Sequence, residues 1–500
     1  MRNGLGAFAA LVTLVVTAAS WGGLDAPPAS HDEASYLLQS RIFADGRWSA
    51  PAPPLPEFFE QYHVLVTPVL ASKYPPGQAL LLTPGVALSV PGLMPLLLSA
   101  LTAFILVVLV APRWGRKVAM ITWAVWLLAP LGLQFRPTYF SEVGTAFLWV
   151  AGWWCLSQWW DGRGDRYLVA LALAVGWMAI TRPLTAVAYA LPLAAVVAPR
   201  VWRARRWRAL GSAMAAGTAV VALLPIWAVS TTGSWTTTPV GLYTAQYMPW
   251  DRIGFGLDST PPLRAGPPDM GSFTQEFAEL HRKFTPMGAL RTAVTRARRL
   301  SYDAWGGAGA LALFLALAGL GRLDRRLALA VGQASGLLLL YAFYSHNERW
   351  NVYYLEALPV FSLMPVLGLY WLDNRAVAGG PPRTSGLVAA GGFALMALMA
   401  AAAMQEFRWV GAGTQPYLRL RSAASTASAP AVVFVRRKPN HSPHVQLVEN
   451  VPDMSAAPIW LAHDLGERNA QLLRLTGDRR AYLFDEATGT LTPIIRRGGG

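Results

Sequence analysis

Eleven apolar stretches, most of them long enough to cross a lipid bilayer, constrain this chain of 500 residues more than any other feature. A helix needs about 20 apolar residues to span the hydrocarbon core, and its backbone polar groups must be satisfied internally there. The sequence therefore predicts an all-α polytopic membrane protein with about eleven transmembrane helices. The stretches are 4–24, 93–111, 118–135, 143–160, 167–181, 184–199, 209–230, 305–320, 327–345, 355–372 and 385–404.

The composition supports a membrane protein and argues against a nucleic-acid partner. Hydrophobic residues make up 54% of the chain and charged residues only 14%, a balance more apolar than that of soluble proteins. The net charge of +15 by itself would also fit nucleic-acid binding, but the basic residues sit at the ends of the apolar stretches. We therefore predict the lipid bilayer as a partner and no nucleic acid.

The distribution of basic residues predicts the orientation of the helices. Four short loops carry two or more Arg or Lys each, and all four fall on one side if there are eleven spans. Such loops face the cytoplasm in most membrane proteins. We expect an inner (plasma) membrane protein whose long loops and C-terminal region are extracytoplasmic. The four loops are 113–117, 163–166, 200–208 and 322–326.

The chain divides into two predicted domains. Residues 1–404 form the transmembrane domain, with long extracytoplasmic loops at 25–92 and 231–304. Residues 405–500 carry more charge and lack long apolar runs, so we predict a small extracytoplasmic α/β domain there. Its predicted elements are strands Ala431–Val435 and Ala481–Phe484 and helix Glu467–Leu475.

Helices are also predicted within the long loops. Ser30 to Glu33 has the pattern of a capping box, which opens a helix. Apolar residues recur at helical spacing behind it, so we expect this helix to lie on the membrane surface. A second interfacial helix is predicted over 77–91, and a short helix near 273–283. The apolar residues are Ala34, Leu37, Leu38 and Ile42.

Two carboxylates at the predicted outer face are candidates for catalysis. Asp32 follows the first apolar stretch and is the candidate general base, although an acid in a first helical turn also complements the helix dipole. Glu142 opens the fourth stretch and either assists Asp32 or pairs with Arg136. Glu33 fits a capping role and is also predicted to contact substrate. An alternative is a divalent cation that bridges Asp32, Glu33 and Glu142; the prediction is no metal ligand and no cofactor.

Isolated cations lie on the same predicted face. Lys73, Arg136, Arg182 and Arg349 each sit in an outer loop. A bare charge at this depth suggests a charged substrate, and arginine binds phosphate oxygens in a bidentate way. The alternative for Lys73, Arg182 and Arg349 is an anchor at the membrane interface, which for Arg349 would pair with Glu348 or Glu356. We predict that these cations contact a lipid-linked phosphate.

Taken in order, these motifs resemble the C-type glycosyltransferase superfamily, and most of all its bacterial branch related to protein O-mannosyltransferases and lipid A aminoarabinose transferases. The resemblance covers about residues 1–375. It implies a polyprenyl-phosphate-linked sugar donor, inversion at the anomeric carbon, Asp32 as the base, and Lys73 and Arg349 near the donor phosphate. The motifs are Asp32-Glu33-Ala34-Ser35-Tyr36, Lys73-Tyr74-Pro75-Pro76-Gly77, Glu142, Thr181-Arg182-Pro183 and Arg349-x-x-x-Tyr353.

The predicted function is that of a membrane glycosyltransferase. It would move a hexose or pentose from polyprenyl phosphate to a hydroxyl of a cell-envelope acceptor, which is a glycan, a lipid or a protein. Tyr74 and Tyr353 lie in the motifs and are predicted to contact substrate. The alternative is a transporter or flippase of lipid-linked glycan intermediates. A transporter should place ionisable residues near the middle of the membrane, whereas these gather at loop ends.

Overall fold

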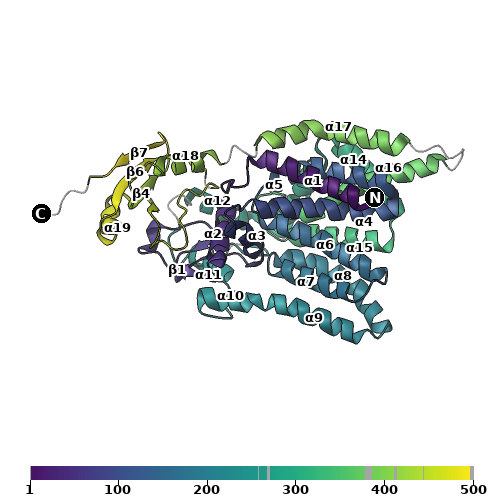
Figure 1. Ribbon diagram of the computed structural model, residues 1–500, viewed down its shortest axis with the longest axis horizontal. Helices are drawn as coiled ribbons and strands as arrows, with labels where there is room; N and C mark the ends of the chain where they lie inside the picture. Colours follow the sequence, from purple (N-terminus) through teal and green to yellow (C-terminus); the bar gives the residue numbers. More distant parts are fainter. Residues whose placement is uncertain are drawn as a thin grey trace.

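Long helices form one end of the molecule, and short helices and strands form the other (Figure 1). The computed structural model describes residues 2–256, 258–266, 271–377, 386–409, 414–442 and 444–495. The helical part comprises α1 (Arg2–Trp21), α4 (Leu93–Leu128), α5 (Pro130–Phe135), α6 (Ser141–Trp160), α7 (Arg166–Ala179), α8 (Pro183–Arg203), α9 (Trp207–Val221), α10 (Leu223–Thr232), α13 (Pro286–Trp305), α14 (Gly309–Gly319), α15 (Arg325–Tyr341), α16 (Leu358–Val377) and α17 (Gly386–Trp409).

Every predicted apolar stretch coincides with one or two of these helices, and the predicted fold class is confirmed. Within the described residues, seven helices are long and apolar enough to cross a membrane. The stretches 93–111 and 118–135 share α4, which is interrupted at Gly115, and the second stretch continues into α5. Gly115 has φ 89° and ψ 167°, and glycine adopts a positive φ without a steric penalty. α4 therefore consists of two helical segments, as the two stretches predict.

The outer surface of the helices is apolar. Phe314 on α14 and Phe393 on α17 expose 63% and 71% of their surface. Inside the bundle, aromatic side chains pack closely, and the ring of Trp149 lies 4.8 Å from that of Tyr189. In water such large exposed apolar side chains would be unfavourable, but lipid accommodates them. The protein is thus a multi-pass membrane protein.

The segment between α1 and α4 folds against the end of the bundle. It contains α2 (His31–Ala44), α3 (Gly77–Ala87) and a three-stranded antiparallel sheet in the order β1-β3-β2. The Ser30 side chain accepts a hydrogen bond from Glu33 N–H, which confirms the predicted helix start. The strands are β1 (Ala50–Pro51), β2 (Val64–Leu65) and β3 (Val69–Ser72).

The prediction that α2 lies on the membrane surface is wrong, because its apolar face is covered by the protein. Ala34, Leu37, Leu38 and Ile42 are buried, each at most 2% exposed. α2 packs against α3 and β3, so the protein itself covers this face. Periodicity identifies an apolar face but cannot distinguish a lipid surface from a protein core.

The second long loop is more helical than predicted. It contains α11 (Pro239–Tyr247) and α12 (Gly271–Lys283), and α13 begins within it. α12 confirms the helix predicted near 273–283. Thr238 and Thr285 cap α11 and α13 through their side chains, and proline follows each as the first helical residue.

The C-terminal region forms a mixed sheet flanked by helices. The strand order is β5-β4-β6-β7, in which β4 is parallel to β5 and β6, and β7 is antiparallel to β6. The two predicted strands and the predicted helix are present, whereas β5 and β7 were not predicted. The predicted boundary after residue 404 falls inside α17. The elements are α18 (Gln415–Ala424), β4 (Ala431–Arg436), β5 (Ile459–His463), α19 (Asn469–Leu475), β6 (Arg480–Asp485) and β7 (Thr490–Pro493).

This small domain docks on the segment between α1 and α4. Phe59 packs edge to face on Trp460 with ring centres 6.0 Å apart. His463 Nε2 lies 2.6 Å from the carbonyl oxygen of Glu60. His31 N–H donates a hydrogen bond of 2.8 Å to the carbonyl of His444, so a loop of the domain reaches the start of α2.

Candidate functional site

A cavity of about 420 Å³ lies where the two long loops, the small domain and the ends of the bundle helices meet. Its walls come from segments that are far apart in the chain. The lining residues are His31, Asp32, Tyr36, His63, Lys73, Tyr74, Phe140, Ser141, Glu142, Arg182, Met248, Asp251, Glu276, Phe277, Leu280, Tyr344, His346, Asn347, Trp350, Val352, Tyr353 and His444.

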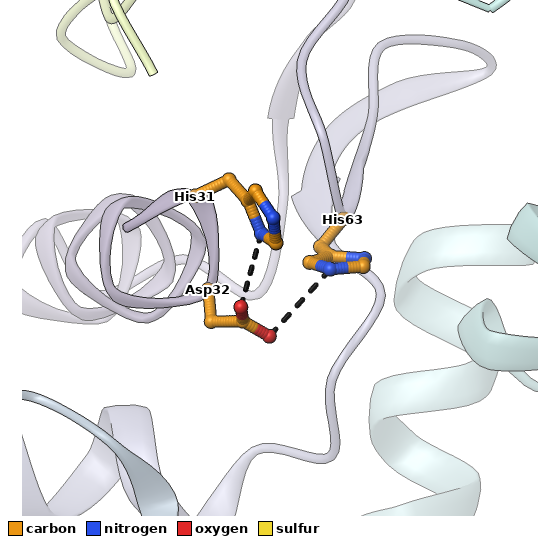
Figure 2. A group of neighbouring side chains, drawn as sticks. All are labelled: His31, Asp32 and His63. Atoms are coloured by element: carbon orange, nitrogen blue, oxygen red, sulfur yellow. Dashed lines mark ion pairs between the residues drawn. The ribbon is translucent and has the colours of Figure 1, made fainter. Parts of the chain in front are cut away.

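Asp32 lies at the start of α2 between two histidines (Figure 2). Its Oδ2 is 3.0 Å from His31 Nδ1, and its Oδ1 is 3.5 Å from His63 Nε2. The hydroxyl of Tyr74 donates a hydrogen bond to Oδ1. Three side chains therefore fix the carboxylate while it still lines the cavity.

The surroundings of Asp32 keep it ionised. Burial acts to raise its pKa, but the adjacent His31 and His63 and the hydrogen bonds from His31 and Tyr74 hold this pKa well below its usual range. An ionised carboxylate accepts protons, which is the form that a general base requires.

Lys73 follows β3 and lies in the cavity wall beside the second long loop. Its Nζ is 3.9 Å from Asp251 Oδ2, which is too long for a hydrogen bond. The rings of Tyr243 and Tyr74 lie 4.8 and 5.3 Å from Nζ. Burial lowers the pKa of Lys73, while Asp251 and Asp32 oppose this shift. The ammonium group of Lys73 therefore does not donate a hydrogen bond to Asp251.

Arg182 lines the cavity and joins two acidic residues. It precedes α8 and pairs with Glu142 Oε1, at the start of α6. Its Nε lies 3.2 Å from Glu356 Oε1, and its Nη2 donates a hydrogen bond of 2.7 Å to the Tyr341 hydroxyl. Two carboxylates already surround this guanidinium, so its main effect is to hold Glu142 in the cavity wall. The predicted alternative partner of Glu142, Arg136, does not contact it.

Six of the nine predicted site residues line this one cavity, and three do not. The six are Asp32, Lys73, Tyr74, Glu142, Arg182 and Tyr353. The ring of Tyr353 stacks on Tyr341 with centres 5.0 Å apart. The sequence motifs thus converge in space, apart from the three residues that follow.

Glu33, Arg136 and Arg349 are placed elsewhere. Glu33 is buried and accepts a hydrogen bond of 3.0 Å from Tyr139 N–H, as well as bonds from Ala29 and Ser30. Arg136 is buried and donates to the carbonyl oxygens of Trp126 and Leu127 near the end of α4. Arg349 is exposed and outside the cavity lining. The structure places these three in capping or surface positions and not among the residues that face the cavity.

Several cavity residues had not been predicted. His63 lies in a loop before β2, Asp251 follows α11, and His346 precedes η4 (Val352–Ala357). His444 comes from the small domain and stacks with Trp350, with ring centres 6.3 Å apart. Each of these residues is single and has no local motif, so sequence spacing holds no signal for it. His31 differs from them, because it adjoins Asp32 within the capping pattern, and Tyr36 lies within the Asp32 to Tyr36 motif.

The fold is similar to that of a solved membrane protein, although sequence comparisons find no relative. No family model matches the chain, and no curated protein matches it. Two of the similar structures have TM-scores below 0.5. The Archaeoglobus fulgidus oligosaccharyltransferase has a TM-score of 0.41 at 13% identity and covers 84% of this chain and 58% of its own. Arabinosyltransferase EmbB from Mycobacterium smegmatis has a TM-score of 0.45 at 15% identity and covers 80% of this chain and 37% of its own.

The structure of ArnT from Cupriavidus metallidurans in the apo state matches almost the whole chain. It covers 95% of this chain and 92% of its own, with a TM-score of 0.51 and 14% identity. This match is at the level of the fold. The chain therefore shares the overall fold of this structure, which agrees with the resemblance drawn from the order of its motifs.

Proposed function

We propose that this protein is a membrane glycosyltransferase that moves a sugar from a polyprenyl-phosphate carrier to an acceptor hydroxyl of the cell envelope, on the extracytoplasmic face. The observation that carries the proposal is that Asp32, Lys73 and Glu142 line one cavity although they come from three separate segments. The fold shared with ArnT supports the same reaction type. Because a shared fold does not establish function, the cavity residues carry the proposal.

Asp32 is the proposed base. The acceptor oxygen attacks the anomeric carbon from the face opposite the phosphate, and its proton passes to the Asp32 carboxylate. The new bond forms while the bond from carbon to phosphate oxygen breaks, so the configuration inverts. A carboxylate with a lowered pKa is a weak base. It therefore takes the proton late, when the acceptor oxygen has already begun to bond to carbon.

Lys73 is the proposed contact for the leaving phosphate. Its Nζ is not hydrogen bonded to Asp251, whereas the guanidinium of Arg182 pairs with two carboxylates. The N–H groups of Lys73 are therefore more available to a ligand than those of Arg182. A cation placed where negative charge develops lowers the barrier to departure. Glu142, held by Arg182, is left to position the acceptor.

The second candidate function is transport of lipid-linked intermediates. Such a protein needs a site near mid-membrane that opens to both sides. Here the cavity lies among α2, the second long loop and the small domain, which gather at one end of the bundle (Figure 1). This placement favours the enzyme.

The deciding experiment uses purified full-length protein in detergent with a panel of polyprenyl-phosphate sugars. Wild type should transfer or hydrolyse at least one of them, and Asp32→Asn should abolish this activity at an unchanged protein level. Asp45→Asn is the matched control, because Asp45 is an exposed aspartate just after the same helix. Near wild-type activity in Asp32→Asn would refute the assignment of the base.

A further inference from the structure

We propose that His31, Asp32 and His63 together bind a divalent transition-metal ion of the zinc type. One possible ligand atom from each residue lies within 4.8 Å of the other two. Figure 2 shows both imidazole rings turned toward the carboxylate, from the start of α2 and from the loop before β2. Two imidazoles and one carboxylate, with a remaining position for substrate, form a donor set that zinc uses in catalytic sites.

The observed separations suit such an ion. A tetrahedral zinc with bonds of about 2.0–2.2 Å separates neighbouring ligand atoms by roughly 3.3–3.6 Å. His63 Nε2 lies 3.5 Å from Asp32 Oδ1, within this range, and His31 Nδ1 lies 3.0 Å from Asp32 Oδ2, slightly below it.

The backbone holds His63 firmly in place. This residue has φ 61°, a left-handed conformation that is uncommon for a residue other than glycine. Its N–H donates to the Tyr243 hydroxyl at 3.0 Å, and its carbonyl accepts from Ser35 Oγ at 2.7 Å and from Lys73 N–H at 2.9 Å. The surroundings thus maintain an unfavourable backbone conformation that turns the imidazole toward Asp32.

One outer contact of the triad is of a kind found in metal sites. The Tyr74 hydroxyl donates a hydrogen bond to Asp32 Oδ1, and such a bond orients a ligating carboxylate. The His31 ring also stacks on Tyr62, with ring centres 4.6 Å apart. All three members of the triad line the cavity, so an open coordination position would face the substrate. Asp32 would bind the ion through one carboxylate oxygen, and its other oxygen would remain to take the acceptor proton.

The charge of the cavity supplies an independent argument. Its lining contains four carboxylates, Asp32, Glu142, Asp251 and Glu276, but only two cations, Lys73 and Arg182. An anionic phosphate would enter a wall that already carries an excess of negative charge, which is unfavourable. A bound divalent ion would reverse this imbalance beside Asp32. This role of the ion rests on the proposed function, whereas its binding does not.

Zinc retained by the full-length protein tests the proposal. After incubation with Zn²⁺ and dialysis, wild type should hold about one ion per chain, the number expected of a single site. His63→Ala and His31→Gln should retain at least about tenfold less. Co²⁺ should give the visible absorption of a tetrahedral site in wild type and not in these variants. Mg²⁺ in excess should not displace either ion, since it prefers oxygen ligands.

His441→Ala is the matched control, because His441 also pairs with a carboxylate, Glu486, at 2.9 Å, but outside the cavity. It should retain zinc as wild type does. Absence of zinc from wild type, or equal retention by His63→Ala, would overturn the proposal and leave a hydrogen-bonded triad only. Zinc binding without sugar transfer would count against the proposed function alone, and transfer by zinc-free protein would count against the metal site alone.

Discussion

Lys73 Nζ lies 3.9 Å from Asp251 Oδ2, and this pair brings the two long loops together at the wall of one cavity. The first of these residues follows β3, and the second follows α11. The contact is too long for a hydrogen bond, so the ammonium can bind an anion without first breaking one to Asp251.

Replacement of Lys73 should weaken donor binding. Lys73→Met keeps most of the side-chain volume but removes the charge, and a hydrogen bond to a charged group contributes about 1.5–3 kcal/mol. We expect the KM for the donor to rise roughly ten- to a hundredfold. Lys117→Met, at an exposed position of α4, is the matched control and should leave KM unchanged. An unaltered KM in Lys73→Met would mean that another group binds the phosphate.

Replacement of Arg182 should mainly lower the stability of the protein. The guanidinium is buried between Glu142 and Glu356, and removal of one partner from a buried ion pair costs about 3–5 kcal/mol. Arg182→Ala should therefore lower the free energy of unfolding, measured by denaturation in detergent. Arg349→Ala, which removes an exposed arginine outside the cavity, should change it by less than about 0.5 kcal/mol.

A double variant separates the charge effect from packing. Arg182→Met with Glu142→Gln removes one of the two stranded carboxylates, so it should be more stable than Arg182→Met alone. If the two variants unfold at the same denaturant concentration, the contact between Arg182 and Glu142 contributes little.

Arg136 should act on stability and not on substrate binding. Its guanidinium donates to the Trp126 carbonyl at 2.9 Å and also to that of Leu127. Arg136→Leu leaves both buried carbonyls without this donor, which should cost about 2–3 kcal/mol. Thermal unfolding should shift down while the KM for the donor stays at the wild-type value. A raised KM at wild-type stability would place Arg136 in the substrate site after all.

Removal of the metal ion should lower sugar transfer, and replacement of Tyr74 should weaken zinc binding without abolishing it. Treatment with a chelator should lower sugar transfer, and added Zn²⁺ should restore it. Tyr74→Phe removes the hydrogen bond to Asp32 but no ligand, so it should need about 10- to 100-fold more Zn²⁺ for the same occupancy, measured by titration. Equal zinc affinity in Tyr74→Phe and wild type would show that this contact does not support the metal site.

Sequence alone was sufficient for the membrane bundle and for most of the cavity's charged residues. Apolar length predicts spanning helices because lipid leaves no alternative for the backbone, and each predicted stretch is helical in the structure. The capping pattern at Ser30 likewise gave the start of α2 and hence the place of Asp32. These signals are local, so they can be read in the order of the chain.

Tertiary structure alone decided which charges share a site. Arg136 and Arg182 both occupy short loops of the same predicted face, but Arg136 turns to carbonyls of α4 whereas Arg182 turns to Glu142. His63 faces Asp32 only because β3 and α2 pack together. The physical reason is that apolar periodicity and caps are set by neighbours in sequence, while the partner of a buried charge is set by packing between distant segments.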